Sequence, residues 1–301
     1  MAGLMDGTTV LVTGASGFTG RHMIASLKGR GYRVVGIGDA KSNADAILSC
    51  DLTQRQAVLD AVLWSRPDHV VHLAAVSFVG HGDAEDFYRV NVFGTLNLLE
   101  ALAALETPPR KVLIASSANI YGTPEVELID ESVCPAPINH YACSKLAMEH
   151  MAHTWFDRLP IIITRPFNYT GPGQDERFLI PKIVSHFKRD APFIELGNLD
   201  VSRDFSDVSD VVAAYTALLE AEAASLTVNV CSGRATSLRE IIAMMSAIAG
   251  HEIEVRINPA FVRPYEIPRL RGNNDLLHRL VRSVPQTPLI DTLMTMYATA
   301  E

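Results

Sequence analysis

The chain has 301 residues, near the upper limit for a single hydrophobic core, so two lobes are expected. Its hydrophobic fraction of 48% and charged fraction of 20% are ordinary for a globular protein. The net charge of −8 comes without any basic cluster, which argues against a nucleic-acid or anionic-membrane partner.

Four cysteines are present, and none forms a C-x-x-C pair, so the sequence predicts neither a metal site nor a disulfide framework. Residues 1–6 lack the basic start of a signal peptide, and no apolar run approaches the roughly 18 residues of a membrane span. We therefore expect a cytoplasmic protein with reduced thiols and no membrane partner.

Short apolar runs alternate with helix-period segments through the first half of the chain. Such runs are typical of parallel strands buried on both faces, and they predict an α/β fold, a Rossmann doubly wound sheet. The expected strands are 9–13, 33–37, 47–48, 70–73, 112–115 and 161–164.

Beyond residue 165 the pattern loosens, and prolines and glycines increase. A helix over 208–221 and a strand over 227–230 are expected to return to the sheet, and a helix is expected over 237–249. The predicted dinucleotide-binding domain covers 1–165 plus about 206–236. A smaller, partly discontinuous substrate-binding lobe covers about 166–205 plus 237–301.

A glycine turn, G-x-x-G-x-x-G, joins the first expected strand to a helix. Glycines here permit a tight turn and a close backbone approach, so that a pyrophosphate can lie on the helix N-terminus. A plain strand-helix turn is the alternative, and the position directly after a buried strand favours the dinucleotide. The candidate cofactor residues are Gly14, Ser16, Gly17, Phe18, Thr19 and Gly20.

The end of the second strand is expected to select between NAD(H) and NADP(H). Asp39 lies where an acidic side chain would bind the adenosine 2′-hydroxyl and repel a 2′-phosphate, which favours NAD(H). Lys41 follows, and a one-residue shift would let it meet that phosphate, so NADP(H) stays open. Asp51 and Leu52 are candidate adenine contacts, with a helix-terminal aspartate as the alternative for Asp51.

Tyr141 and Lys145 stand four residues apart at the start of an expected helix, so that phenol and ammonium share one face. A free tyrosine has a pKa of about 10, and a nearby positive charge lowers that pKa. Such a pair makes a proton donor for a carbonyl oxygen, although an isolated Y-x-x-x-K is usually a surface contact. Ser117 follows the strand 112–115, at the sheet edge where ligands bind.

These motifs occur in a fixed order along nearly the whole chain. They are the glycine turn, His72-Leu73-Ala74-Ala75, Asn91-Val92-Phe93-Gly94-Thr95, Ser116-Ser117-Ala118-Asn119-Ile120-Tyr121-Gly122, the Tyr141–Lys145 segment and Arg165-Pro166-Phe167-Asn168. Together they resemble the extended short-chain dehydrogenase/reductase family of nucleotide-sugar epimerases, dehydratases and reductases.

The second half narrows the resemblance. Segments 167–174, 197–208, 229–233 and 263–273 are similar to patterns of GDP-mannose-type members, above all the GDP-4-keto-6-deoxy-D-mannose reductases that make GDP-D-rhamnose. The resemblance implies a GDP-sugar substrate, NAD(P)H as hydride donor and a homodimer formed through the helix after Asn91 and the Tyr141–Lys145 helix. The apolar positions available for such an interface, or for the core instead, are Leu96, Leu98, Leu99, Ala147, Met148 and Met151.

The resemblance also assigns roles. Tyr141 is the implied proton donor, Lys145 its partner on the nicotinamide ribose, and Ser117 the group that binds the 4-keto oxygen. Further implied cofactor contacts are Leu73, Ala74, Ala75 and Asn91. Implied substrate contacts are Asn168 at the sugar-phosphate, Arg203 at the diphosphate, and Arg263 and Glu266 at the nucleotide ribose.

Some positions depart from the family pattern. His140 stands where proline is common, Tyr169 where histidine is common, and the segment 283–285 lacks the usual tryptophan. Dehydratases of this family carry an acid just after the catalytic serine or threonine, whereas Ala118 and Asn119 stand here, which argues against dehydration. A 4-epimerase and a catalytically idle dinucleotide sensor remain as alternatives to the 4-ketoreductase.

Overall fold

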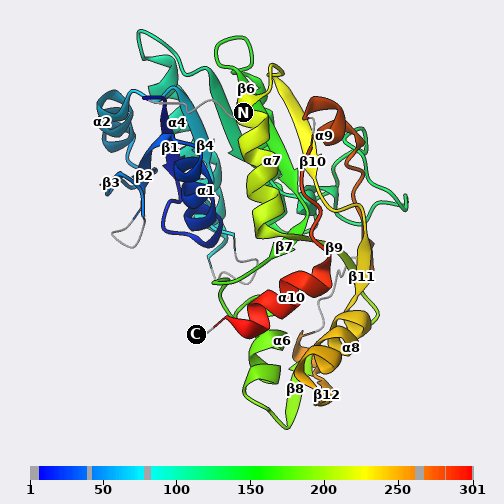
Figure 1. Cartoon of the computed structure of the whole chain (residues 1–301). Coiled ribbons are helices and arrows are strands. Elements are labelled where there is room, and N and C mark those ends of the chain that lie inside the picture. Colours follow the sequence, from blue (N-terminus) through cyan, green and yellow to red (C-terminus); the bar gives the residue numbers. More distant parts are fainter. Residues whose placement is uncertain (1–6, 39–42, 78–82, 262–267, 282, 300–301) are drawn as a thin grey trace.

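A central parallel sheet dominates the computed structural model, which describes residues 7–38, 43–77, 83–261, 268–281 and 283–299 (Figure 1). Its seven strands have the order β10-β6-β5-β4-β1-β2-β3, and every pairing is parallel. They are β1 (Thr9–Thr13), β2 (Arg33–Ile37), β3 (Ala46–Leu48), β4 (His69–His72), β5 (Lys111–Ala115), β6 (Ile161–Pro166) and β10 (Leu226–Val230).

Helices cover both faces of this sheet, because successive side chains of a strand point to opposite sides. Val10 and Val12 pack under α1 (Phe18–Gly29) and α7 (Val208–Glu220), whereas Leu11 packs under the opposite layer. That opposite layer consists of α2 (Arg55–Ser65), α4 (Thr95–Ala103) and α5 (His140–His153). The doubly wound Rossmann architecture predicted from the sequence is therefore confirmed.

The short helices near the sheet edge shape its carboxyl end. The helix α3 (Ala84–Tyr88) leads into a π-helical segment, η1 (Arg89–Gly94), and a 3₁₀ turn, η2 (Ala118–Tyr121), follows β5. Asn139 caps α5 by accepting a hydrogen bond from the Ala142 N–H at 2.9 Å. Single-turn π-segments are frequent at functional sites, and this one lies against α5.

A smaller lobe follows β6 and lies below the sheet in Figure 1. In it β9 (Ser202–Asp207) pairs with β7 (Asn168–Thr170), β11 (Ala235–Ser237) and β13 (Arg269–Leu270), while β8 (Phe193–Leu196) pairs with β12 (Glu254–Ile257). A separate apolar core joins three of its helices. These helices are α6 (Leu179–Lys188), α8 (Leu238–Ala249) and α10 (Leu289–Ala298), and α9 (Asp275–Leu280) packs near β10.

Every strand expected in the sheet is present, with ends shifted by at most a few residues. The helices expected over 208–221 and 237–249 are also present, each one residue shorter. The domain boundaries themselves remain a prediction. Within the described ranges, no helix is both long and apolar enough to cross a membrane.

Close backbone contacts fix the glycine turn between β1 and α1. Gly14 has φ +68°, and a Cβ there would lie 2.9 Å from the Ala74 nitrogen. A Cβ on Gly20 would lie only 2.1 Å from the Gly14 carbonyl oxygen, so the first turn of α1 packs directly on the loop. These two positions need glycine for reasons that the backbone itself imposes.

We expect Gly20→Ala to displace the Gly14 carbonyl and so to weaken both folding and dinucleotide binding. Gly29→Ala is the matched control, because it lies in the same helix and a Cβ there meets no atom within 4 Å. The control is expected to be neutral or to stabilise by about 0.5–1 kcal/mol, the usual helix gain over glycine. Chemical denaturation and titration with NADPH measure both effects, and equal behaviour of the two variants would contradict the packing argument.

Candidate active site

Three predicted catalytic side chains meet at the carboxyl end of β5. Ser117 follows that strand, and its hydroxyl caps η2 by accepting the Asn119 N–H at 3.2 Å. Tyr141 and Lys145 come from the first turns of α5, and the Ser117 hydroxyl hydrogen-bonds the Tyr141 phenol. The three side chains are nearly buried, so charges on them interact more strongly than they would in water.

Burial raises the pKa of Tyr141 to about 12, against a small lowering effect of the Ser117 hydrogen bond. The expectation that Lys145 lowers this pKa is therefore wrong for the chain by itself. One helical turn brings the two residues onto the same face, but loss of hydration of the phenolate outweighs that proximity. The phenol is consequently held in its neutral, proton-bearing form around pH 7.

The Lys145 ammonium donates a hydrogen bond to the Ala115 carbonyl at 2.8 Å. Burial lowers its pKa to about 8, and the negative charge of Glu149 acts in the opposite direction. Lys145 therefore remains mostly charged at pH 7, with a margin of about one pH unit.

The imidazole of His72 joins three elements at this edge. Its Nδ1 lies 2.6 Å from the Thr13 hydroxyl and its Nε2 lies 2.8 Å from the Thr95 hydroxyl. The Thr95 hydroxyl donates to the Asn91 carbonyl, so Nε2 is the nitrogen that donates and Nδ1 accepts. Burial lowers the pKa of His72 to about 3, so the ring is neutral.

Asn91 has a structural use that the sequence did not reveal. Its amide exchanges hydrogen bonds with the backbone of Val76 and donates to the Ser144 hydroxyl at 3.0 Å. It thereby joins the strand end after β4 to α5. Leu73 and Ala74 lie against the glycine turn, where the Ala74 N–H donates to Thr13. The cofactor roles of Asn91, Leu73, Ala74 and Ala75 remain predictions.

The glycine turn is bonded to the segment that enters the small lobe. The Thr19 hydroxyl lies 2.8 Å from the Tyr169 hydroxyl, and the Phe18 ring stacks on Tyr169 with centroids 6.2 Å apart. From the next positions of α1, Arg21 donates to the Gly173 carbonyl and His22 lies 3.0 Å from the Pro172 carbonyl. Neither Arg21 nor His22 stands out in the sequence, because these partners are backbone atoms 152 and 150 residues away.

Among the predicted substrate contacts, the Asn168 side-chain nitrogen is buried and has no hydrogen-bond partner within the described residues. Buried amide donors are nearly always paired, so an orphan at this point is a candidate for a ligand contact. Arg203 lies on β9, next to Asp204. The Asp204 carboxylate accepts from the backbone N–H groups of Ser232, Gly233 and Gly272 and fixes both neighbouring loops.

Not all predicted residues can be placed. Asp39, Arg263 and Glu266 lie outside the described residues. Asp51 accepts hydrogen bonds from the N–H and hydroxyl of Thr53, a turn-capping contact, and its adenine role remains a prediction together with that of Leu52. In the described part of the chain, no group of three or more His, Cys, Asp or Glu side chains is arranged to hold a metal.

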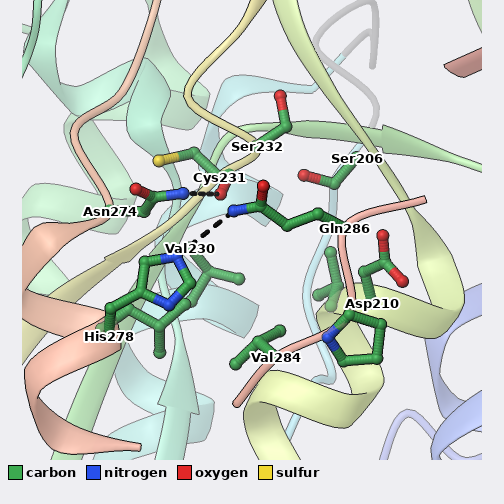
Figure 2. A pocket seen from close by; sticks show the side chains of 12 residues that line it. Ser206, Asp210, Val230, Cys231, Ser232, Asn274, His278, Val284 and Gln286 are labelled. Carbon is green, nitrogen blue, oxygen red and sulfur yellow. Dashed lines mark hydrogen bonds between the residues drawn. The ribbon is translucent and has the colours of Figure 1, made fainter. Parts of the chain in front are cut away.

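The cavity drawn in Figure 2 lies at the end of β10, between α7 and α9. Asn274 donates to the Cys231 carbonyl at 3.2 Å, and the Gln286 amide lies 3.2 Å from His278 Nε2. Ser117, Tyr141 and Lys145 do not line it. Val284 and Pro285 do, from the segment where the family pattern carries tryptophan. The cavity is therefore separate from the candidate active site.

Comparison with known proteins agrees with this geometry. The model of the NAD dependent epimerase/dehydratase family matches residues 10–231. The chain belongs to this family. A GDP-6-deoxy-D-talose 4-dehydrogenase from Aggregatibacter actinomycetemcomitans is 38% identical, with 96% of each chain covered. A GDP-6-deoxy-D-mannose reductase from Pseudomonas aeruginosa is 36% identical, with 94% of each covered.

Two solved structures support the same placement. A protein from Burkholderia cenocepacia J2315 is 50% identical and superposes with a TM-score of 0.91 over 97% of each chain. RMD from Pseudomonas aeruginosa, determined with NADPH, is 34% identical and superposes with a TM-score of 0.85 over 97% of this chain and 96% of that one.

Because the pKa of His72 is lowered in the folded protein, folding stability should depend on pH. An unfolded histidine takes up its proton below about pH 6.5, whereas folded His72 does so near 3, so folding is opposed as the pH falls through that window. Between pH 7 and pH 5 this residue should remove about 2 kcal/mol of stability, since one pKa unit is about 1.36 kcal/mol.

His72→Gln keeps a donor and an acceptor but cannot titrate. We expect it to destabilise the protein at pH 7 and to lose about 2 kcal/mol less than the wild type on going to pH 5. Urea unfolding at the two pH values measures the difference. An equal loss of stability in both proteins would show that the imidazole is not held neutral.

Proposed function

We propose that the protein is an NAD(P)H-dependent nucleotide-sugar 4-ketoreductase that converts GDP-4-keto-6-deoxy-D-mannose to GDP-D-rhamnose. The observation that carries this proposal is the buried, hydrogen-bonded pair of Ser117 and Tyr141, with Lys145 one turn away, at the carboxyl edge of the sheet. Two adjacent hydroxyl groups can both donate hydrogen bonds to a carbonyl oxygen that gains negative charge during reduction.

The glycine turn fits a dinucleotide, because Gly14 and Gly20 leave no room for side chains beside the backbone that would meet the pyrophosphate. When bound, NAD(P)H would supply the hydride for the 4-keto carbon. Ser117 and Tyr141 would stabilise the negative charge on the keto oxygen, and Tyr141 would deliver its proton to that oxygen. A phenol with a pKa of about 12 keeps that proton until a stronger base, the alkoxide, forms beside it.

Lys145 carries a positive charge one helical turn from Tyr141 and is proposed to bind the nicotinamide ribose. Dehydration is disfavoured because the buried Ala118 and the amide of Asn119 stand where a general base would be needed. The proposed substrate contacts are Asn168, Arg203, Arg263 and Glu266. Asn168 is supported by its buried side-chain nitrogen, which has no hydrogen-bond partner among the residues that the structure describes.

The GDP-sugar assignment is supported by the two relatives at 38% and 36% identity, whose names concern GDP-6-deoxy sugars. Talose and mannose differ in configuration at C4, so the two names describe opposite faces of hydride addition. We propose the rhamnose product, and the coupling between H3 and H4 of the isolated sugar distinguishes it from the talose product.

The cofactor preference, the location and the assembly are predictions of the sequence. NAD(H) is favoured through Asp39, and a cytoplasmic homodimer is expected. Of the expected interface residues, Leu98, Leu99 and Met148 are buried in the core of the single chain, whereas Ala147 is exposed. Light scattering that gave the 32.8 kDa of one chain would exclude the dimer.

The direct test incubates the protein with GDP-4-keto-6-deoxy-D-mannose and either NADH or NADPH while the absorbance of the dihydronicotinamide is followed. We expect oxidation of the cofactor in step with formation of a GDP-6-deoxyhexose. An epimerised GDP-sugar without net oxidation would identify a 4-epimerase instead. Tight cofactor binding with no product would contradict the reductase assignment for this sugar.

We expect Tyr141→Phe to lower kcat by roughly 10²–10⁴-fold, the usual contribution of a positioned general acid, with dinucleotide affinity retained. Tyr88→Phe is the matched control, because its phenol contacts His140 at the start of the same helix and is not the partner of Ser117. Steady-state kinetics and a dinucleotide titration measure both variants. Full activity of Tyr141→Phe would remove this residue as the proton donor.

A further inference from the structure

One helical turn beyond Lys145 lies a buried carboxylate that the proposed chemistry does not use. Glu149 is 1% exposed and shares the inner face of α5 with Lys145. Its two oxygens accept three hydrogen bonds from the Arg165 guanidinium on β6, at 2.7 to 3.2 Å. This is a two-pronged ion pair with little water around it, which is the geometry that a buried pair needs.

The guanidinium extends the network toward the serine. Arg165 donates to the Tyr121 hydroxyl at 2.9 Å and lies over the Tyr121 ring at 5.0 Å. Tyr121 in turn donates to the Asn229 side chain at 2.7 Å, which anchors it to β10. Tyr121 is the last residue of η2, and Ser117 caps the first turn of that same short segment.

Glu149 thus acts on both parts of the candidate catalytic centre, on Lys145 through its charge and on the Ser117 turn through hydrogen bonds. It is rigidly placed one turn from Lys145 on α5, and through Arg165 and Tyr121 it fixes the segment that begins at Ser117. We propose that Glu149 is a positioning residue that keeps the Lys145 ammonium charged and holds the Ser117 turn against α5. This inference rests on the proposed function, because that function makes Lys145 and Ser117 catalytic.

The charges facing Lys145 support the electrostatic half of the proposal. From β4 it faces His72, which is neutral. Its own helix carries the neutral Tyr141 one turn before it and the Glu149 carboxylate one turn after it. From β5 the Ala115 carbonyl accepts its hydrogen bond. On β6 Arg165 forms an ion pair with Glu149, which reduces but does not remove the effect of the Glu149 charge on Lys145. Burial lowers the pKa of Lys145 and Glu149 raises it.

The sign follows from this balance. Without the Glu149 carboxylate, burial acts without this opposing effect, and the pKa of Lys145 falls below its value of about 8 in the wild type. Lys145 is then charged in a smaller fraction of molecules at pH 7. We expect Glu149→Gln to lower the pKa of Lys145 and, through the smaller charged fraction, kcat/KM at pH 7; a fall of one unit from about 8 corresponds to a loss of about two-fold.

The decisive measurement is an NMR titration of ¹³C-labelled lysine side chains in the dinucleotide-free protein, with the Lys145 signal assigned by its loss in Lys145→Gln. It needs no turnover, so an inactive wild type would overturn the proposed function without affecting this result. A pH profile of kcat/KM provides the second readout, and its alkaline limb should move to lower pH in Glu149→Gln.

The variants are chosen so that a folding defect does not hide the answer. Because Glu149→Gln leaves Arg165 buried without its anion, the double variant Glu149→Gln/Arg165→Met removes both charges and is expected to fold with the Lys145 pKa still lowered. Glu176→Gln is the control, because it breaks a comparable pair with Arg189 that is exposed on the surface. A Lys145 pKa unchanged in both Glu149 variants would overturn the proposal.

Discussion

Burial of ionisable groups at the carboxyl edge of the sheet is the constraint on which the candidate site depends. A parallel sheet covered by helices on both faces leaves little water at the base of the loops that follow its strands. Tyr141, Lys145, Glu149 and Arg165 are all buried in this region. Each charge placed there costs desolvation unless a partner compensates for it. The protein responds by leaving the phenol neutral and pairing the carboxylate with the guanidinium.

The same constraint explains why backbone atoms have such a large part in the site. The Lys145 ammonium is held by the Ala115 carbonyl, and Arg21 of α1 reaches the Gly173 carbonyl across the entrance to the small lobe. Backbone carbonyls supply partial negative charge without a titratable group. The glycine turn and the segment after β6 are thereby joined, so the loops proposed to bind cofactor and substrate are held together by direct hydrogen bonds.

The sequence predicted the sheet well, because strands buried on both faces are continuous apolar runs that stand out against helical periodicity. It also predicted that Ser117, Tyr141 and Lys145 lie close together. The position of Ser117 follows from the end of its strand, and that of Tyr141 and Lys145 from their four-residue spacing on a helix. The sequence predicted a lowered pKa for Tyr141, whereas burial raises it. Residue spacing shows which groups are close, but it does not show how far they are removed from water. Arg21 and His22 were missed because their partners are backbone atoms distant in sequence, and Glu149 could have been found from its four-residue spacing to Lys145.

The neutral phenol bears on the direction of the proposed reaction. For reduction, the enzyme must hold a proton on Tyr141 until hydride transfer creates an alkoxide, and burial of the phenol supplies that without help. For oxidation of the alcohol, the phenolate must exist first, and the same burial opposes it. The Ser117 hydrogen bond and a nearby positive charge both offset that cost, and Lys145 keeps its charge at pH 7 by a margin of about one pH unit. Glu149, by sustaining that charge, therefore matters more to the oxidative direction than to the reductive one.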